Sequence, residues 1–434
     1  MPGTLREADK QAILNAAELL IEDATNFLQG LIQIPSVNPP GNAYHECAHY
    51  IGEHLSRLGY KVDYIALTEG EAAELAPYGE NMPRTNVLGR LSWTQSSPVL
   101  HFNGHMDVVP PGSGWTKSPF GGEVHDKRIY GRGAADMKGG IAAQIYAVEA
   151  IRRAGLHLMG NIEQSGVVDE ESTGNRNAGM GVLVERGYIS SKHTDYVVIT
   201  EPLNVDNICL GHRGAIWGEI QTFGRQSHGS TPAQGINALE HMAGFIAEAT
   251  HQLSPHLQQR LNHHPVVPIN ANAASLAFTM IQAGTNVNSV PDTCTVSFDR
   301  RLATSEQLDD ARHELWDILE HRKKIVPDFR YEYTERYAAA PTWVSSDTPL
   351  VQAFTEAIQD VLGRAPGYVC SPGTDDQRFV VQNAGIQQCI VYGPGEITQA
   401  HIVDESLAIA DLLSSIKVMA LATARLIGVQ SEHE

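Results

Sequence analysis

The first half of the chain alternates between helical and strand-like patterns of apolar residues. Apolar positions recur every three or four residues, as amphipathic helices require, in three segments: 9–33, 43–59 and 138–155. Short apolar runs lie between these segments and predict strands at 58–67, 86–93, 98–104, 161–168 and 194–200. Helices that alternate with strands are typical of an α/β fold with a mostly parallel sheet.

The pattern changes near residue 208. Longer strand-like runs occupy 208–225, 275–284, 294–302 and 329–336, and helical spacing recurs at 236–260 and 305–322. The alternation then returns, with helices predicted at 348–363 and 404–427 and a strand at 387–393. We therefore predict one α/β domain, formed by residues 1–210 and 336–434, that is interrupted by an inserted α+β domain over residues 211–335.

The composition and charge disfavour several classes of protein. The chain has 434 residues, of which 42% are hydrophobic, so it can bury a sizeable core. It carries 31 Lys and Arg against 50 Asp and Glu, and a formal net charge of −19 disfavours nucleic acid and anionic membranes as partners. No apolar run is long enough to span a bilayer, and the N-terminus lacks the apolar stretch of a secretory signal.

The cysteines indicate a reducing compartment. There are five of them, an odd number, and no pair has C-x-x-C spacing. Neither a disulfide framework nor a thiolate zinc site is therefore expected. Together with the preceding observations, this predicts a soluble cytoplasmic protein.

Side chains of the kind that bind metal ions cluster after the predicted strands of the α/β domain. In chain order they are His105, Asp107, Asp136, Asp169, Glu170, Glu171, Glu201 and, from a later segment, His401. Ligands of open α/β sheets bind outside the carboxyl ends of the strands, so we expect these side chains at one site. Imidazoles and carboxylates suit borderline divalent ions such as zinc, cobalt and manganese.

The number of carboxylates favours two metal ions over one. A single catalytic zinc ion normally takes three protein ligands, whereas a pair of ions with a bridging carboxylate accounts for the surplus. Such ions polarise a scissile carbonyl and lower the pKa of a water towards ~7. A further carboxylate must then accept the proton of that water. Each short motif is weak evidence by itself, and the interpretation depends on their occurring together in this order.

Six motifs, taken in order, resemble those of one enzyme family. They are GHMDVVP, GRGAADMKGG, DEESTG, TEP, SHGSTP and AHIVDE. The order is similar to that of the co-catalytic metallohydrolases that include acetylornithine deacetylase, succinyl-diaminopimelate desuccinylase, glutamate carboxypeptidase and aminoacylase. The resemblance implies that His105 and Glu201 bind one metal ion and that Glu171 and His401 bind the other. It also implies that Asp136 bridges the two ions.

The resemblance assigns further roles around the metal ions. Asp107 would orient the His105 imidazole through its carboxylate, and Glu170 would be the general acid and base. The inserted domain would be a lid or dimerisation domain. Its His228 would reach the active site of a neighbouring subunit and stabilise the oxyanion. The resemblance thus implies a homodimer.

Four residues are candidates for substrate binding. Asn288 and Arg301 resemble the substrate-binding pair of the family's lid domain, and a guanidinium suits a substrate carboxylate. The alternative is that Arg301 forms a structural ion pair with Asp299. Gly373 and Thr374 belong to GTDDQR, which resembles the loop that lines the substrate pocket.

The expected activity is hydrolysis of an amide-type C–N bond with two divalent ions per chain, zinc being the first choice. In the family, Glu at the position of Glu201 accompanies deacylases and carboxypeptidases, so cleavage of an N-acyl group or of a C-terminal residue is favoured, and an N-acyl amino acid is the first choice of substrate. The alternatives are a metal-dependent deformylase or aminohydrolase acting on an amino-aromatic compound, and a carboxypeptidase or dipeptidase. An alternative of another class, a non-catalytic metal-binding homologue, is disfavoured because all five ligands and Glu170 are present.

Overall fold

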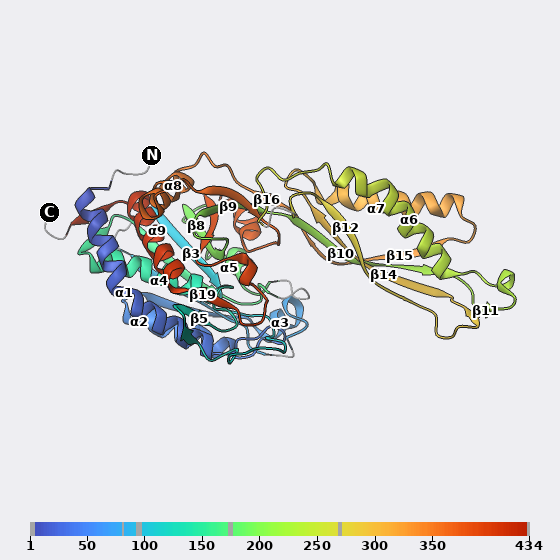
Figure 1. Cartoon of the computed structure of the whole chain (residues 1–434), viewed down its shortest axis with the longest axis horizontal. Helices are drawn as coiled ribbons and strands as arrows, with labels where there is room; N and C mark the ends of the chain where they lie inside the picture. Colours follow the sequence, from blue (N-terminus) through green and yellow to red (C-terminus); the bar gives the residue numbers. More distant parts are fainter. Residues whose placement is uncertain (1–4, 80–81, 93–97, 172–176, 268–270, 432–434) are drawn as a thin grey trace. The chain divides into compact units, whose positions relative to one another are not determined.

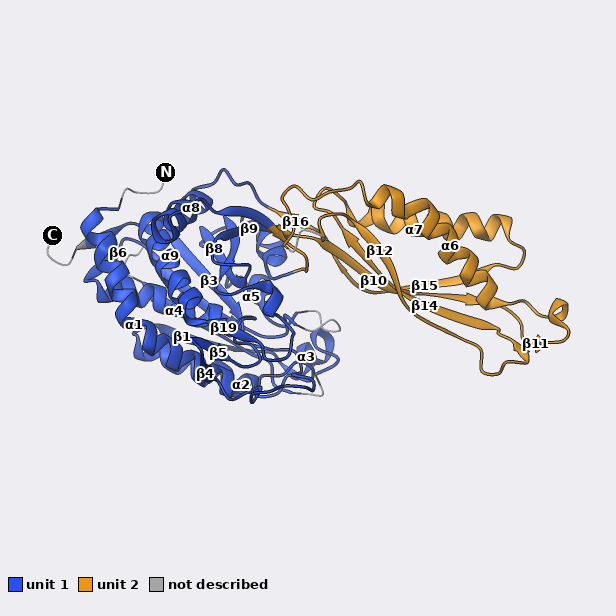
Figure 2. Ribbon diagram, viewed as in Figure 1, with its two compact units in different colours: residues 1–210, 344–369, 375–434 blue, residues 211–343, 370–374 orange. Residues whose placement is uncertain are grey.

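The chain divides into two compact units. The computed structural model describes residues 5–79, 82–92, 98–171, 177–267 and 271–431 (Figure 1). Unit 1 consists of residues 1–210, 344–369 and 375–434, and unit 2 consists of residues 211–343 and 370–374 (Figure 2). Among the described residues, no helix combines the length and apolarity that a membrane span requires.

A mixed sheet forms the centre of unit 1. Its strands, in spatial order, are β1 (Lys61–Ala66), β2 (Thr85–Ser92), β7 (Asn161–Val167), β3 (Val99–His105), β8 (Tyr196–Pro202), β18 (Cys389–Gly393), β9 (Asn207–His212) and the short β16 (Thr342–Trp343). Strand β17 (Gly367–Ser371) also pairs with β9. Neighbours from β7 to β18 run parallel, whereas the pairs β1–β2, β2–β7 and β18–β9 are antiparallel. The prediction of a mostly parallel sheet is therefore right for the centre and wrong for the flanks.

The reversed direction of β9 has a simple cause. Only four residues join the end of β8 at Pro202 to the start of β9 at Asn207. A parallel crossover needs a dozen or more residues, so β9 must reverse direction relative to β8. Because β18 is parallel to β8, the pairing of β9 with β18 is antiparallel.

The long helices of unit 1 follow the predicted segments closely. They are α1 (Glu7–Gln33), α2 (Tyr44–Arg57), α4 (Lys138–Arg153), α8 (Pro349–Leu362) and α9 (Ile409–Ile427). Helix α4 is almost wholly buried because it packs against both α1 and α9 as well as the sheet. Helix α9 begins later than predicted, since residues 406–408 form the short strand β19.

Unit 2 is a four-stranded antiparallel sheet with two helices. The strand order is β12 (Ser275–Ala283), β14 (Thr293–Leu302), β10 (Gly214–Phe223) and β15 (Arg330–Ala339). Buried and more exposed residues alternate along β14, as expected of a strand with one covered face. Helices α6 (Ala238–Leu257) and α7 (Leu308–Ile325) pack on that face and complete a separate apolar core (Figure 2).

The order of strands in unit 1 explains where polar side chains gather. Strands β7, β3 and β8 are neighbours and run parallel, so their carboxyl ends lie at one edge of the sheet. Strand β3 ends at His105, β7 ends two residues before Asp169, and β8 includes Glu201. The sheet therefore brings together side chains that are up to 96 positions apart in the sequence.

Candidate metal centre

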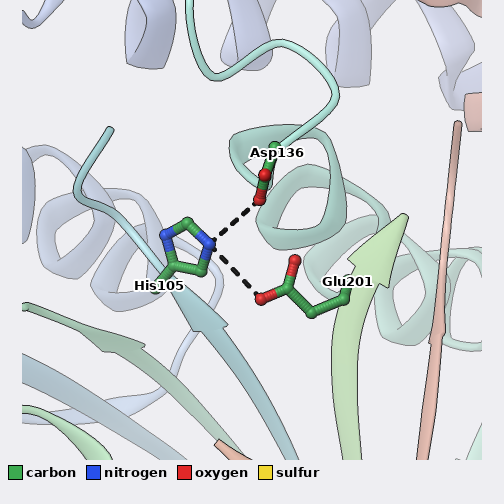
Figure 3. A group of neighbouring side chains, drawn as sticks. All are labelled: His105, Asp136 and Glu201. Atoms are coloured by element: carbon green, nitrogen blue, oxygen red, sulfur yellow. Dashed lines mark hydrogen bonds and ion pairs between the residues drawn. The ribbon is translucent and has the colours of Figure 1, made fainter. Parts of the chain in front are cut away.

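The first group of potential metal ligands consists of His105, Asp136 and Glu201. The His105 Nε2 atom lies 3.1 Å from Asp136 Oδ1 and 3.3 Å from Glu201 Oε1 (Figure 3). Asp136 lies just before the first turn of α4, and its backbone N–H donates to the buried Glu405 carboxylate. The His105 side chain is only 1% exposed, so the group is closed to solvent on the imidazole side.

The second group shares Asp136 with the first. His401 Nε2 lies 2.8 Å from Glu171 Oε2 and 3.4 Å from Asp136 Oδ2. In each group the candidate ligand atoms lie within 4.8 Å of one another. Asp136 thus directs one carboxylate oxygen to each group, which is the geometry of a bridging ligand. The His401 side chain is 53% exposed, so this side of the centre is open.

The buried charges of the centre strongly perturb one another. Burial raises the pKa of Glu171 to about 7 and that of Glu201 to about 8, and repulsion from Asp136 adds to both shifts. Hydrogen bonds to Asp136 and Glu171 raise the pKa of His401 to about 11. Although burial opposes it, hydrogen bonds from His105 and His401 lower the pKa of Asp136 below its ordinary range. Crowded buried carboxylates of this kind are best satisfied by cations.

The donor set fits two divalent cations. His105 Nδ1 lies 2.9 Å from the backbone carbonyl of Asp107, which accepts its N–H, so Nε2 faces Asp136 and Glu201 and would offer a lone pair to a cation bound between them. The ligands would be the imidazoles of His105 and His401 and the carboxylates of Asp136, Glu171 and Glu201, and Asp136 is the residue that the two groups share. Nitrogen and oxygen donors in this mixture suit zinc, cobalt or manganese.

Asp107 lies beside the imidazole that it is expected to orient. Its carboxylate lies 3.7 Å from His105 Nδ1, within ion-pair distance, and the hydrogen bond to Nδ1 is made by the backbone carbonyl of the same residue. The carboxylate accepts from Asn38 Nδ2 at 2.8 Å and from the backbone N–H groups of Glu170 at 3.3 Å and Glu171 at 3.1 Å. Asp107 thus fixes the segment that carries Glu170 and Glu171.

Glu170 lies beside the metal centre without belonging to either ligand group. Burial raises the pKa of its carboxyl well above the ordinary value, and repulsion from Glu201, Asp376 and Glu171 adds to this. A carboxyl with a raised pKa next to a metal centre is suited to exchanging protons near neutral pH.

Asp376 is a neighbour of the site that the sequence did not single out. It is buried and accepts hydrogen bonds from Asn103 Nδ2 at 3.0 Å and Asn177 Nδ2 at 2.9 Å. Its charge contributes to the raised pKa of Glu170. A signal for it is present in GTDDQR, where two adjacent acids directly follow the candidates Gly373 and Thr374.

The inserted unit places His228 and Asn288 together. His228 on β11 (Ser227–His228) pairs with Ser289 on β13 (Ser289–Val290), and the Gly229 N–H donates to the Asn288 carbonyl. The backbone N–H of Ser230 donates to His228 Nδ1 at 3.1 Å. Nδ1 therefore acts as an acceptor, which places the ring N–H on Nε2, where it can donate to an anion.

Arg301 lies on β14 in the four-stranded sheet of unit 2, away from the separate two-stranded sheet β11–β13. It is eight residues beyond the start of β14 at Thr293, about 25 Å along the strand, whereas β13 with Asn288 precedes that start. Its guanidinium is paired with Asp299 at 2.8 Å and lies 5.2 Å from the centre of the Trp217 ring. Asn288 and Arg301 of one unit 2 therefore do not form a contiguous pair, and the structural pairing of Arg301 with Asp299 is observed.

The remaining substrate-binding candidates lie in the loop 370–374 of unit 2. The Thr374 hydroxyl is 2.8 Å from the Tyr337 hydroxyl, and Tyr337 stacks on Trp217 at 4.4 Å between ring centres. A side chain at Gly373 would meet nothing within 4 Å. Thr374 thus belongs to a polar and aromatic cluster with Arg301.

The geometry is that of a candidate centre for two metal ions. Residues 101–425 match the model of peptidase family M20/M25/M40, and the chain belongs to this family. The chain is 29% identical over 392 residues to a succinyl-diaminopimelate desuccinylase of Methylorubrum extorquens (strain PA1), covering 88% of this chain and 94% of the relative. It is thus a hydrolase of amide-type C–N bonds.

Solved structures share the fold. The di-peptidase Dug1p of Saccharomyces cerevisiae superposes with a TM-score of 0.74 at 16% identity, covering 97% of this chain and 99% of that chain. The Bacillus subtilis YXEP protein, described as a dinuclear metal-binding peptidase of the M20 family, superposes with a TM-score of 0.64 at 16% identity, covering 94% and 99%.

Proposed function

We propose that this chain removes the acyl group from an N-acyl amino acid with the help of two divalent cations. The observation that carries the proposal is the position of Asp136, whose two carboxylate oxygens face two separate groups of ligands. Bound there, the cations would polarise the scissile carbonyl and acidify a water. Succinyl-diaminopimelate desuccinylase, the relative with the stated similarity, acts on a bond of this class.

The chain itself supplies the proton transfers. Glu170 would accept a proton from the attacking water and then pass it to the nitrogen of the leaving amine. Its raised pKa suits both steps, because the carboxyl can hold the proton between them. Asp107 keeps the backbone of Glu170 in place through the N–H hydrogen bond.

We also propose a homodimer in which His228 stabilises the oxyanion in the neighbouring subunit. Two observations support this. The Nε2 proton of His228 makes the ring a donor, as an oxyanion requires. Within the described part of unit 2, β12 is an edge strand that pairs only with β14, and it exposes Met280 and Ile281 by 62% and 51%. An exposed apolar edge strand is a template for pairing with another chain.

The metal and the compartment are also proposals. The mixture of imidazole and carboxylate donors favours zinc, with cobalt or manganese as alternatives. All five cysteines are free thiols and buried, which supports a cytoplasmic location.

The candidates for binding a carboxylate-bearing substrate stay Arg301, Asn288, Gly373 and Thr374. To bind it, Arg301 would have to exchange its contact with Asp299 for the substrate.

A substrate screen on metal-reconstituted protein tests the proposal. The panel should contain N-acetyl, N-succinyl and N-formyl amino acids, dipeptides and amino-aromatic acids. We expect the highest kcat/KM on an N-acyl amino acid, with loss of activity after chelation and recovery on adding zinc, cobalt or manganese. Preference for dipeptides would favour the peptidase alternative, for which the fold of Dug1p is a precedent. Activity that survives complete removal of metal would refute the proposal.

A further inference from the structure

Asp169, the residue before Glu170, has an unusual backbone conformation. Its φ is +59°, in the left-handed region that residues other than glycine seldom adopt. The residue is 1% exposed and lies beyond the end of β7, where the chain turns to present Glu170 and Glu171. A strained conformation persists only when its surroundings hold it, so the partners of Asp169 are informative.

Two buried side chains hold the carboxylate of Asp169, one at each oxygen. Arg84 Nε donates to Oδ2 at 2.8 Å, and the Tyr44 hydroxyl donates to Oδ1 at 2.9 Å. The side chains of both Arg84 and Asp169 are 0% exposed. Arg84 also donates to the backbone carbonyls of Met82 and Pro40, at 3.0 and 2.6 Å.

The Arg84–Asp169–Tyr44 cluster is therefore connected to other parts of unit 1. The guanidinium of Arg84 lies 5.1 Å from the centre of the Tyr44 ring, and Tyr44 begins α2. Arg84 directly precedes β2. Because the cluster joins a helix, a strand and the turn after β7, it forms a rigid support beneath that turn.

Asp107 holds the same segment from a second direction. Its carboxylate accepts the backbone N–H groups of Glu170 and Glu171, as described above. The side chain of Glu171 has its own anchor, the imidazole of His401. Among the described residues, none donates a hydrogen bond to the carboxyl of Glu170. The direction of that carboxyl thus depends on the backbone at residues 169–171.

We propose that Arg84, Tyr44 and Asp169 are positioning residues that aim the carboxyl of Glu170. The inference rests on the proposed role of Glu170 in proton transfer. It predicts that loosening the cluster lowers kcat while substrate affinity and metal content stay the same, because the metal ligands are held by contacts of their own.

Tyr44→Phe is the mildest test, since it removes one hydrogen bond and keeps the buried ring. Loss of a residue that orients an active-site group typically costs 10–100-fold, so we expect kcat to fall by about tenfold or more. We expect KM to change by less than about twofold and metal content to be unchanged. Tyr392→Phe is the matched control, because Tyr392 is also fully buried and donates one hydrogen bond, to the Val205 carbonyl at 2.9 Å.

Two substitutions at Asp169 give an independent measurement. Asparagine tolerates a positive φ and keeps a side-chain acceptor for Arg84, whereas alanine offers neither. We expect kcat to decrease in the order wild type, Asp169→Asn, Asp169→Ala. If Tyr44→Phe does not fold, Asp169→Asn provides the test of the positioning role in its place.

Several outcomes would overturn the inference. They are an unchanged kcat in Tyr44→Phe, a loss equal to that in Tyr392→Phe, or a loss explained by missing metal. Glu170→Gln, measured alongside, distinguishes failure of the proposed function from failure of the positioning role alone. If Glu170→Gln is active, the proposed function itself fails. If Glu170→Gln is inactive and Tyr44→Phe behaves like wild type, only the positioning role fails.

Discussion

At the scale of single residues, Asp136 is the side chain that both halves of the metal centre have in common. Its Oδ1 faces His105 and its Oδ2 faces His401. The two imidazoles each serve one group only. Substitutions should therefore have unequal effects on metal content, and this inequality distinguishes a bridged pair from two independent sites.

We expect Asp136→Ala to lose both ions and His105→Ala and His401→Ala to keep about one ion per chain each. The measurement is elemental analysis of purified variants after dialysis against the metal. His125→Ala is a suitable control, because its ring is 60% exposed and lies outside both groups. Two ions in Asp136→Ala would contradict the bridging assignment.

Glu170 should affect turnover without affecting metal content. Glutamine has nearly the same shape but cannot accept a proton, so Glu170→Gln should lower kcat by roughly 100-fold or more. Both ions should remain, because Glu170 belongs to neither ligand group. Steady-state kinetics and metal analysis on the same preparation check this. A variant that keeps near wild-type turnover would show that another group accepts the proton.

Residue type and order predicted which side chains gather at the centre, but not the contacts that orient them. His105, Asp136, Glu171, Glu201 and His401 do come together. The hydrogen bond from the His105 ring to the backbone carbonyl of residue 107 could not be predicted, because every residue has a carbonyl. The support of Asp169 by Arg84 joins residues 85 positions apart, and nothing in either local sequence indicates it.

At the scale of elements, periodicity predicted most helices and strands but not all strand directions. The four-residue connection before β9 was visible in the sequence and could have indicated its reversal. In unit 2, alternation along β14 separates two adjacent arginines. Arg300 is buried and pairs with Glu306 and Glu314, whereas Arg301 is directed to the other face. Sequence alone could not say which guanidinium is available.

The packing of α2 against α1 and α4 should depend on pH through one histidine. The ring of His54 lies 4.3 Å from that of Phe27 and 5.7 Å from that of Tyr146, measured between centres. Burial, followed by repulsion from Arg57, lowers its pKa from 6.5 to about 4. The unfolded chain therefore binds more protons between these values, and stability falls as the pH drops through this window.

Between pH 7 and pH 5, we expect the free energy of unfolding to fall by about 1–2 kcal/mol more in the wild type than in His54→Gln. Urea denaturation of both proteins at the two pH values gives this difference. His125→Gln is the control, since its exposed ring should leave the wild-type dependence intact. Equal pH dependence in wild type and His54→Gln would show that protonation of His54 is not linked to folding.

At the scale of the whole molecule, the division into two units raises the question of whose active site the residues of unit 2 complete, that of their own chain or that of a neighbouring subunit. His228 lies in the two-stranded sheet β11–β13, whereas Arg301 lies near the end of β14 in the four-stranded sheet, so one unit 2 presents two separate sets of candidate residues. The proposed homodimer assigns His228 to the neighbouring subunit. That assignment makes each active site a composite of two chains, which co-expression of two variants can test.

Glu170→Gln and His228→Ala chains should each be weakly active alone and should complement each other when co-expressed. In a mixed dimer, the site on the His228→Ala chain keeps its own Glu170 and receives an intact His228 from its partner. With random pairing, half of the dimers are mixed and each holds one complete site, so activity should recover to about a quarter of wild type.

Co-expression of Glu170→Gln with Asp136→Ala is the control, because both substitutions lie in unit 1. There the mixed dimer holds no complete site, and no recovery is expected. Absence of recovery in the His228 pair, although mixed dimers are present, would place His228 at the active site of its own chain or at none.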